Sequence, residues 1–263
     1  MKQLAGIHPL ITRPKTQAQS LANRICQHGG QVCLLPTIEI IPCLARRQLA
    51  TQLATLPPID ILIFISPSAI EQANHLLQQQ PHLAWQTKLC VVMGEPSAKL
   101  LKQYGSIDIH YPTSHYSTEA GLALPQLQQV AQQHIVIFKG EGGRPLLADT
   151  LRERGATVTE IICYQRRLPT LPPEQRQQLL QQTDINCILS TSIVSADNLR
   201  ILLGSTGTTW WRQRQWVVSS QRLANHLVDY RLTKPPLIAQ NASDDAIIST
   251  LMNHAKSIVA THS

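Results

Sequence analysis

The sequence predicts an α/β protein of two flavodoxin- or Rossmann-like lobes with parallel sheets, related by internal duplication. Three observations predict this. The chain has 263 residues, enough for two modest domains, and 43% of them are hydrophobic. Short apolar segments alternate with helical patterns along the whole length. Matched residues in the two halves of the chain are separated by one constant distance.

The repeat is carried by pairs of equal or similar residues whose separation does not change along the chain. The pairs, each 126 positions apart, are Gly29 and Gly155, Ser66 and Ser192, Trp85 and Trp211, Ala98 and Ala224, and Ala120 and Ala246. Because the separation holds without a gap, it indicates duplication of a unit of about half the chain.

Each copy is expected to contain strands that alternate with helices. The strands expected are 9–12, 32–35, 59–65, 89–93, 107–111, 135–138, 158–162, 186–189, 215–218 and 237–239. The helices expected are 16–28, 46–56, 67–77, 96–104, 118–130, 145–154, 174–182, 195–203, 221–229 and 244–257. Apolar strands between helices are typical of parallel sheets covered on both faces. Ligands of such sheets bind beyond the carboxyl ends of the strands, and two facing lobes would form a cleft.

Charge and composition exclude several function classes. The net charge is +7, but the basic residues are scattered and form no block with interleaved aromatics, so no nucleic-acid partner is expected. A polyanionic small molecule explains the positive balance equally well. The longest apolar runs are much shorter than the ~20 residues of a membrane-spanning helix. The first residues lack the apolar core of a secretion signal, so we expect a cytoplasmic protein with no membrane partner.

Cysteines and histidines give no sign of a metal site. None of the six cysteines forms a CxxC pair, and no histidine lies at zinc-finger spacing from them. We interpret the cysteines as buried or half-buried thiols of a reducing compartment, and we expect no metal.

The turns that follow strands supply the candidate binding residues. Thr12 can cap the next helix, and Arg13 can reach an anion held at its N-terminus; the alternative is a capped helix with a solvent-exposed arginine. In the second copy, Lys139, Gly140 and Arg144 belong to a glycine-rich turn in which backbone amides can approach an anion. This turn matches neither GxxxxGK[ST] nor GxGxxG, which argues against an NTPase or a dinucleotide site. A flexible turn that serves topology alone is the alternative.

Hydroxyl groups recur at equivalent turns of both copies. The candidates for substrate binding are Ser66, Ser68, Ser97, Ser192 and Ser220. Hydroxyls and backbone amides at helix starts bind carboxylates well, although simple N-capping explains each single serine equally well. Tyr164 ends a strand just before two arginines; its phenol is a proton donor at neutral pH, or simply an amphipathic residue at a strand end.

Taken in order, these motifs resemble the uroporphyrinogen-III synthase family over nearly the whole chain. The residues that carry the resemblance are Thr12-Arg13-Pro14, Gly29-Gly30, Leu35-Pro36, 63–69, Met93-Gly94, Ser97-Ala98, Tyr111-Pro112, 117–119, 139–144, Gly155, Tyr164, 219–224 and 242–244. The chain departs from the family pattern in having Ser97 where many members have threonine, Ile193 in place of proline, and Ser220 and Leu223 in place of Gly-x-x-Thr.

The resemblance implies a fold in which the chain crosses between lobes twice. One lobe would contain residues 1–39 and 167–263 and the other residues 40–166, with extended connectors near 38–42 and 164–169 that form a two-stranded hinge. The implied reaction converts hydroxymethylbilane, an octacarboxylate, to uroporphyrinogen III with loss of water and inversion of ring D. It implies no cofactor, a monomer, and transient handover of substrate from hydroxymethylbilane synthase.

Within this resemblance Tyr164 matches the conserved tyrosine of the family and is the candidate general acid. Two other functions stay open from the residues alone. A non-catalytic two-lobed binder of tetrapyrroles or small anions would yield only the type I isomer. A nucleotide-dependent transferase would use residues 140–143 for phosphates and would be stabilised by nucleotides.

Overall fold

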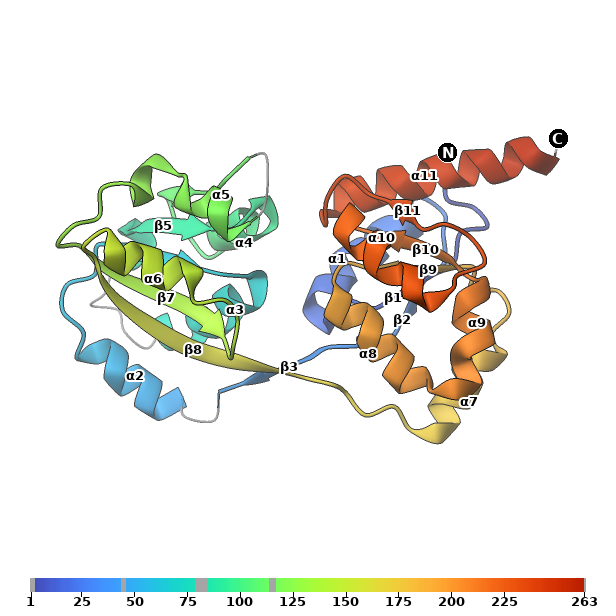
Figure 1. Ribbon diagram of the computed structural model, residues 1–263, viewed down its shortest axis with the longest axis horizontal. Coiled ribbons are helices and arrows are strands. Elements are labelled where there is room, and N and C mark those ends of the chain that lie inside the picture. Colours follow the sequence, from blue (N-terminus) through green and yellow to red (C-terminus); the bar gives the residue numbers. More distant parts are fainter. Residues whose placement is uncertain (1–2, 44–45, 79–84, 114–116, 263) are drawn as a thin grey trace. The chain divides into compact units, whose positions relative to one another are not determined.

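The computed structural model describes residues 3–43, 46–78, 85–113 and 117–262. The chain divides into two compact units, which are considered separately (Figure 1). Unit 1 contains Met1–Glu39 and Arg167–Ser263, and unit 2 contains Ile40–Arg166. The N-terminal segment and the C-terminal third of the sequence therefore fold together.

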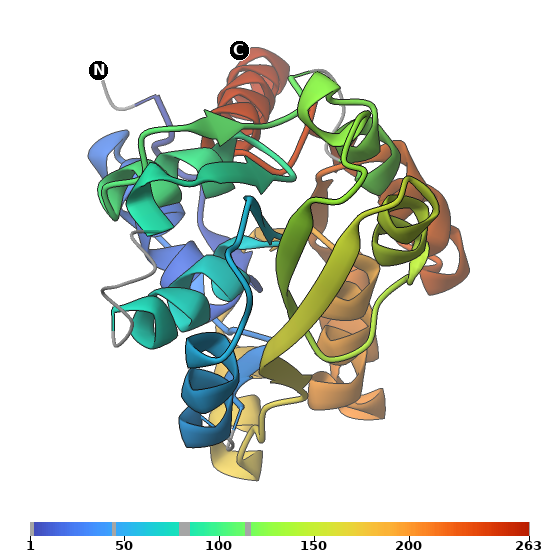
Figure 2. The ribbon, with the colours of Figure 1, turned by 90° about the vertical axis from the view of Figure 1, so that its left-hand side faces the viewer.

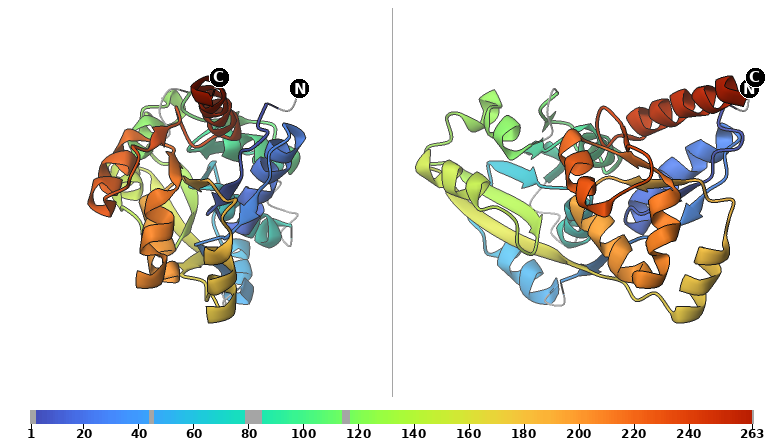
Figure 3. Two further views of the ribbon diagram at one scale, coloured as in Figure 1. Left: turned by 90° about the vertical axis from the view of Figure 1, so that its right-hand side faces the viewer. Right: turned by 45° about the vertical axis from the view of Figure 1, so that its right-hand side comes forward.

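Unit 1 is built on a five-stranded sheet whose strands pair in parallel, in the order β11-β10-β9-β1-β2. Its strands are β1 (Pro9–Ile11), β2 (Cys33–Leu34), β9 (Cys187–Ser190), β10 (Gln215–Val218) and β11 (Leu237–Ile238). Its helices are α1 (Lys15–Gln27), α7 (Pro173–Gln181), α8 (Ile193–Leu203), α9 (Thr208–Gln213), α10 (Gln221–His226) and α11 (Asp244–His262). Helices α1 and α11 bury one face of the sheet, and α7 to α10 bury the other (Figure 3).

Unit 2 contains a six-stranded sheet in the order β3-β8-β7-β4-β5-β6. Its strands are β3 (Glu39–Pro42), β4 (Ile61–Phe64), β5 (Leu89–Val92), β6 (Ile109–His110), β7 (His134–Gly140) and β8 (Thr157–Arg167). Its helices are α2 (Arg46–Ala54), α3 (Pro67–Leu77), α4 (Glu95–Gln103), α5 (Thr118–Leu122) and α6 (Leu146–Glu153). Helices α2, α3 and α4 cover one face, and α5 and α6 cover the other (Figure 2). The edge strand β3, expected only as a connector, makes this sheet mixed rather than wholly parallel.

The two sheets repeat the same order over five strands, and their central strands repeat the same register. Strand β4 begins at Ile61 and β9 at Cys187, 126 positions later, and β5 and β10 are related in the same way. Ile61 pairs with Leu89 and Ile135, and its counterpart Cys187 pairs with Gln215 and Pro9, each shifted by the same 126 positions. The internal duplication is therefore visible at the level of individual strand pairs.

Other elements also differ from those expected. The helix expected at 118–130 stops at Leu122, because Leu124 precedes Pro125 and takes an extended conformation (φ −61°, ψ 139°). Strand β8 continues to Arg167, five residues beyond the strand expected there. Helix α9 was not anticipated from the sequence. None of the helices in the described part of the chain is long and apolar enough to cross a membrane.

Candidate functional site

The candidate residues lie at the carboxyl edges of the two sheets. In unit 2, Ser66 follows β4, Lys139 and Gly140 end β7, and Tyr164 lies in the last third of β8. In unit 1, the residues that follow β1, β9 and β10 are Arg13, Ser192 and Ser220. Within each unit these residues share one edge, because the carboxyl ends of parallel strands lie together.

A small pocket of about 110 Å³ lies at this edge of unit 2. Four of the candidates, Lys139, Gly140, Arg144 and Tyr164, line it. Two residues that the sequence analysis did not select, Glu160 and Arg166, line it as well. The structure therefore brings the glycine-rich turn and the tyrosine together at one place.

A break in strand register sets the position of Tyr164. Lys139 pairs with Ile162, but the next residue, Gly140, pairs with Tyr164, so β8 has one extra residue at Cys163. Such a bulge re-aims the side chains that follow it and is common next to active sites. The Tyr164 side chain is only 1% exposed and packs into the core under α3 while it lines the pocket.

Gly140 allows the phenol ring to occupy this position. A Cβ atom at Gly140 would lie 2.6 Å from Cζ and 3.0 Å from the hydroxyl oxygen of Tyr164. Both distances are shorter than a normal contact, so any larger residue would displace the ring. In this structure the glycine thus serves the close approach of an aromatic side chain, a role that the sequence analysis did not assign to it.

The Tyr164 hydroxyl has two hydrogen-bond partners. Ser66 Oγ lies 3.0 Å away, and Arg166 Nη2 donates to the hydroxyl over 2.8 Å. Ser66 also caps α3 by accepting a hydrogen bond from the Ala69 backbone amide at 3.1 Å. The hydroxyl of Ser66 therefore serves both as a helix cap and as a partner of the Tyr164 phenol.

The two other cations of the pocket are paired with carboxylates. Lys139 Nζ lies 2.8 Å from Glu160, and hydrogen bonding from this lysine lowers the pKa of the glutamate. Arg144 donates two hydrogen bonds to Glu119, at 2.7 and 3.3 Å, and these lower the pKa of Glu119 to about 2. An incoming anion must therefore compete with these carboxylates for either cation.

The remaining serines of unit 2 lie in the first turns of helices. Ser68 is 2% exposed near the start of α3, and Ser97 is 4% exposed near the start of α4. Neither belongs to the lining of the pocket around Tyr164, as far as the described residues define it. The structure therefore separates these two serines from the cluster around the tyrosine.

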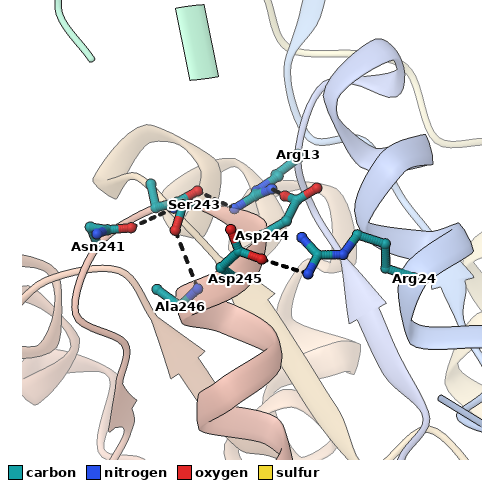
Figure 4. Close-up of polar contacts among 8 residues, drawn as sticks. Arg13, Arg24, Asn241, Ser243, Asp244, Asp245 and Ala246 are labelled. Carbon is teal, nitrogen blue, oxygen red and sulfur yellow. Dashed lines mark hydrogen bonds and ion pairs between the residues drawn. The ribbon is translucent and has the colours of Figure 1, made fainter. Parts of the chain in front are cut away.

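Arg13 lies in a buried ion pair of unit 1 rather than on the surface (Figure 4). Its Nη1 lies 2.6 Å from Asp244 Oδ1, and its Nη2 donates to the Ala242 carbonyl over 2.5 Å. Arg24 of α1 makes a parallel contact of 2.6 Å with Asp245 (Figure 4). The carboxylate that Arg13 contacts is therefore Asp244 at the start of α11, and a substrate anion must compete with it for this arginine.

The serines of unit 1 act as helix caps. Ser192 accepts a hydrogen bond from the Ser195 amide at 3.1 Å, and Ser220 accepts one from the Leu223 amide at 3.3 Å. Each side chain keeps its own proton and further acceptor capacity, so capping leaves a ligand contact possible.

A buried hydroxyl cluster lies beside these caps in unit 1. Thr12 Oγ1 and Thr37 Oγ1 lie 2.7 and 2.9 Å from Ser195 Oγ, and all three residues are at most 2% exposed. Thr12 also donates to the Leu189 carbonyl over 2.7 Å. Satisfied buried networks of this kind rigidify a site.

The remaining side chains of chemical interest are those that could bind a metal and the cysteine thiols. Within the described ranges, no group of three or more His, Cys, Asp or Glu side chains is placed to hold a metal ion. Cys26 is exposed, contrary to the interpretation of every cysteine as buried or half-buried. Burial raises the pKa of Cys163, the residue of the bulge, to about 12 and keeps it a thiol.

Arg166 and Glu160 are the residues that sequence reasoning missed. Arg166 was noted only as part of a charged segment after Tyr164. Side chains two apart in a strand project to the same side, so the spacing of Tyr164 and Arg166 was a usable signal. Glu160 gave no such signal, because its contact with Lys139 depends on how β7 and β8 pair.

Comparison with known proteins gives one consistent family. A family model described as "Uroporphyrinogen-III synthase HemD" matches residues 19–249. Uroporphyrinogen-III synthase of Salmonella typhimurium is 30% identical over 247 residues, which cover 92% of this chain and 98% of the relative. The enzyme of that name from Escherichia coli is 30% identical over 250 residues, with the same two coverages.

Solved structures agree on the fold. The uroporphyrinogen-III synthetase of Helicobacter pylori matches with a TM-score of 0.63 at 16% identity, covering 94% of this chain and 99% of that one. A mutant uroporphyrinogen III synthase of Thermus thermophilus matches with a TM-score of 0.57 at 14% identity, covering 95% and 99%. At these identities the likeness establishes the architecture alone.

Proposed function

The chain belongs to the uroporphyrinogen-III synthase family, and on that premise we propose that it cyclises hydroxymethylbilane with Tyr164 as the general acid. The observation that carries the proposal is the hydrogen-bonded position of the Tyr164 hydroxyl, between Ser66 and Arg166 at the edge of a pocket. A phenol held in this way can donate its proton to a substrate oxygen.

The first chemical step is loss of the hydroxyl group from the hydroxymethyl carbon on ring A. The carbon–oxygen bond breaks, the ring A nitrogen supplies the electron pair, and Tyr164 transfers its proton to the departing oxygen, which leaves as water. A protonated azafulvene, the azafulvenium cation, remains on the substrate, and a phenolate remains on Tyr164. Ser66 and Arg166 hold the phenol oxygen in place during this transfer.

The second step determines the isomer. The substituted α-carbon of ring D attacks the azafulvenium cation and forms a spiro intermediate, which fragments and recloses with ring D inverted. Loss of a ring proton then restores the aromatic pyrrole and returns a proton to Tyr164. A 100-fold preference for this route over direct closure to the type I isomer requires only ~2.7 kcal/mol of differential stabilisation, which positioning can supply.

The substrate carboxylates are proposed to contact the cations and hydroxyls at the sheet edges. In unit 2 these are Lys139 and Arg144, with the serines Ser68 and Ser97 and the Gly140 backbone, while Ser66 acts on the substrate through the Tyr164 hydroxyl. In unit 1 they are Arg13, Ser192 and Ser220. This proposal is supported by the helices that begin at these sheet edges, because helix N-termini favour negative charge. The cytoplasmic location stays a prediction from the N-terminal sequence, and the monomeric state and handover from hydroxymethylbilane synthase stay predictions from the resemblance.

The test is turnover of enzymatically generated hydroxymethylbilane, followed by separation of the product isomers. We expect the unaltered protein to give the type III isomer. Tyr164→Phe removes the acid but keeps the ring, so we expect kcat to fall roughly 10- to 100-fold, at the low end of general acid catalysis, with the type III isomer retained.

Tyr111→Phe is the matched control, because Tyr111 lies near β6, away from the pocket around Tyr164. We expect its kcat to equal that of the unaltered protein. Formation of type I product alone by the unaltered protein would show a non-catalytic binder. An undiminished rate in Tyr164→Phe would remove this tyrosine from the mechanism.

A further inference from the structure

Arg166 is the cation closest to the proposed acid. Its side chain lines the pocket of unit 2, and Nη2 donates to the Tyr164 hydroxyl over 2.8 Å. The guanidinium carbon also lies 5.4 Å from the centroid of the Tyr164 ring. In the part of the chain that the structure describes, no carboxylate lies within ion-pair distance of Arg166, in contrast to Lys139 and Arg144.

The donors and acceptors of Tyr164, Ser66 and Arg166 determine where the proton of the Tyr164 hydroxyl points. A guanidinium can only donate, so the Tyr164 oxygen accepts from Arg166. Ser66 Oγ accepts from the Ala69 amide and still has its own proton to donate to Tyr164 over 3.0 Å. When both neighbours donate, the acceptor sites of the phenol oxygen are filled, and its proton points to a third group. That arrangement presents the proton to a substrate oxygen.

Charge adds to this directional effect. Negative charge develops on the phenol oxygen as its proton is transferred, and a hydrogen bond from a cation to an anion is about twice as strong as a neutral one. An interaction that is stronger in the transition state than in the ground state accelerates the reaction. Lys139 and Arg144 each face a carboxylate, so Arg166 is the cation placed to stabilise the phenolate.

We propose that Arg166 is a positioning residue for the reaction: it orients the Tyr164 hydroxyl and stabilises the phenolate formed during proton transfer. The inference rests on the proposed function, because it requires Tyr164 to be the acid. It adds a residue to the mechanism and predicts that the contributions of Arg166 and Tyr164 depend on each other.

The test is a double-mutant cycle on turnover of hydroxymethylbilane with Arg166→Met, Tyr164→Phe and both together. We expect Arg166→Met alone to lower kcat about 10-fold with little change in KM, the pattern of an interaction made in the transition state. In the Tyr164→Phe background we expect Arg166→Met to have less than about a twofold effect on kcat, because no phenolate forms there. Phenylalanine keeps the ring, so loss of the cation–π contact cancels in the comparison.

Two further variants separate positioning from folding. Arg166→Lys keeps a cationic donor, and we expect it to recover part of the lost kcat. Arg167→Met removes the neighbouring arginine, whose side chain projects to the other side of the strand, and we expect an unchanged kcat. Thermal unfolding of each variant, followed by circular dichroism, checks that the fold is intact.

The outcomes distinguish this inference from the proposed function. If Tyr164→Phe is slow and Arg166→Met slows it by the same factor as in the unaltered protein, Arg166 acts independently and the inference is wrong, while the acid role of Tyr164 stands. If Tyr164→Phe turns over at the full rate, the proposed role of Tyr164 fails and the inference fails with it.

Discussion

Each unit of this protein has its own sheet, and the two sheets are equivalent, but the residues at their carboxyl edges differ. In unit 1, Thr12, Thr37 and Ser195 form a buried hydroxyl cluster. The residues 126 positions away in unit 2 are Phe138, Cys163 and Ala69, which are apolar or thiol side chains of the core. The position equivalent to Ile38 is occupied by Tyr164 in unit 2.

The difference shows how a duplicated scaffold separates structural from chemical tasks. Equivalent helices keep equivalent caps, since Ser66 and Ser192 each accept an amide hydrogen bond at 3.1 Å. Among the residues that the structure describes, the capping serine also meets a phenol hydroxyl beside a pocket in unit 2 only. Thr12, Thr37 and Ser195 of unit 1 are hydrogen-bonded to one another, whereas Tyr164 of unit 2 lines a pocket and is proposed to offer its proton to a ligand.

Substitution of the cations at positions 13 and 139 is expected to give the largest difference in unfolding free energy between equivalent positions of the two units. The two positions are 126 apart, and each has a cation paired with a carboxylate. Arg13→Met would leave Asp244 without its partner in a largely buried place, and we expect a loss of about 2 to 4 kcal/mol in unfolding free energy. Lys139→Met should cost about 1 kcal/mol, because its pair is more exposed and Arg152 still contacts Glu160.

Urea unfolding at neutral pH measures both values. The double variant Arg13→Met with Asp244→Asn is the control, and it should recover part of the loss because it removes the unpaired charge. Equal costs at positions 13 and 139 would contradict the contrast in burial on which this prediction rests.

Substitution of Gly140 is expected to have the next largest effect on unfolding free energy. Gly140→Ala places a methyl group 2.6 Å from the Tyr164 ring, and we expect a loss of about 1 to 3 kcal/mol through overpacking. Turnover should fall as well, because the displaced ring carries the proposed acid. In a Tyr164→Ala background the same change meets no ring, so its effect on unfolding free energy should disappear. A cost that persists in that background would place the strain elsewhere.

The smallest effect concerns the exposed pair of Arg144 and Glu119. Arg144 lowers the pKa of Glu119 from 4.5 to about 2, so the stabilisation is fully present above pH 4.5 and is lost as the pH falls towards 2. Both groups are exposed, and the effect on unfolding should be slight. Arg144→Gln should return the pKa of Glu119 towards 4.5 in an NMR titration of its carboxyl carbon. Arg152→Gln is the control and should leave that pKa low.

The fold was largely predictable because its signals are local. Apolar runs bounded by glycine, proline and serine place most strands and helices, and the constant separation of Ser66 and Ser192 reveals the duplication. Errors arose where one residue redirects the chain. Pro125 ends a helix that the spacing of apolar residues would continue. The extra residue Cys163 in β8 is not revealed by the alternation of apolar and polar residues along the strand.

The site was predictable in part, because sequence shows which residues follow strands but not what they contact. Tyr164, Lys139 and Gly140 were selected and do lie at one pocket. The partner of Arg13, however, is Asp244, 231 residues along the chain, and no local pattern connects the two. Pairing of distant charges depends on tertiary packing, which is why the sequence did not predict Asp244 as the partner of Arg13.

Single-turnover ring closure in H2O and in D2O tests the central claim most directly. If the Tyr164 proton is transferred as the hydroxyl group leaves, the unaltered protein should form the type III isomer more slowly in D2O. In Tyr164→Phe that isotope effect should shrink while ring closure itself becomes slower. Equal isotope effects and equal rates in the two proteins would contradict the assignment of Tyr164 as the acid.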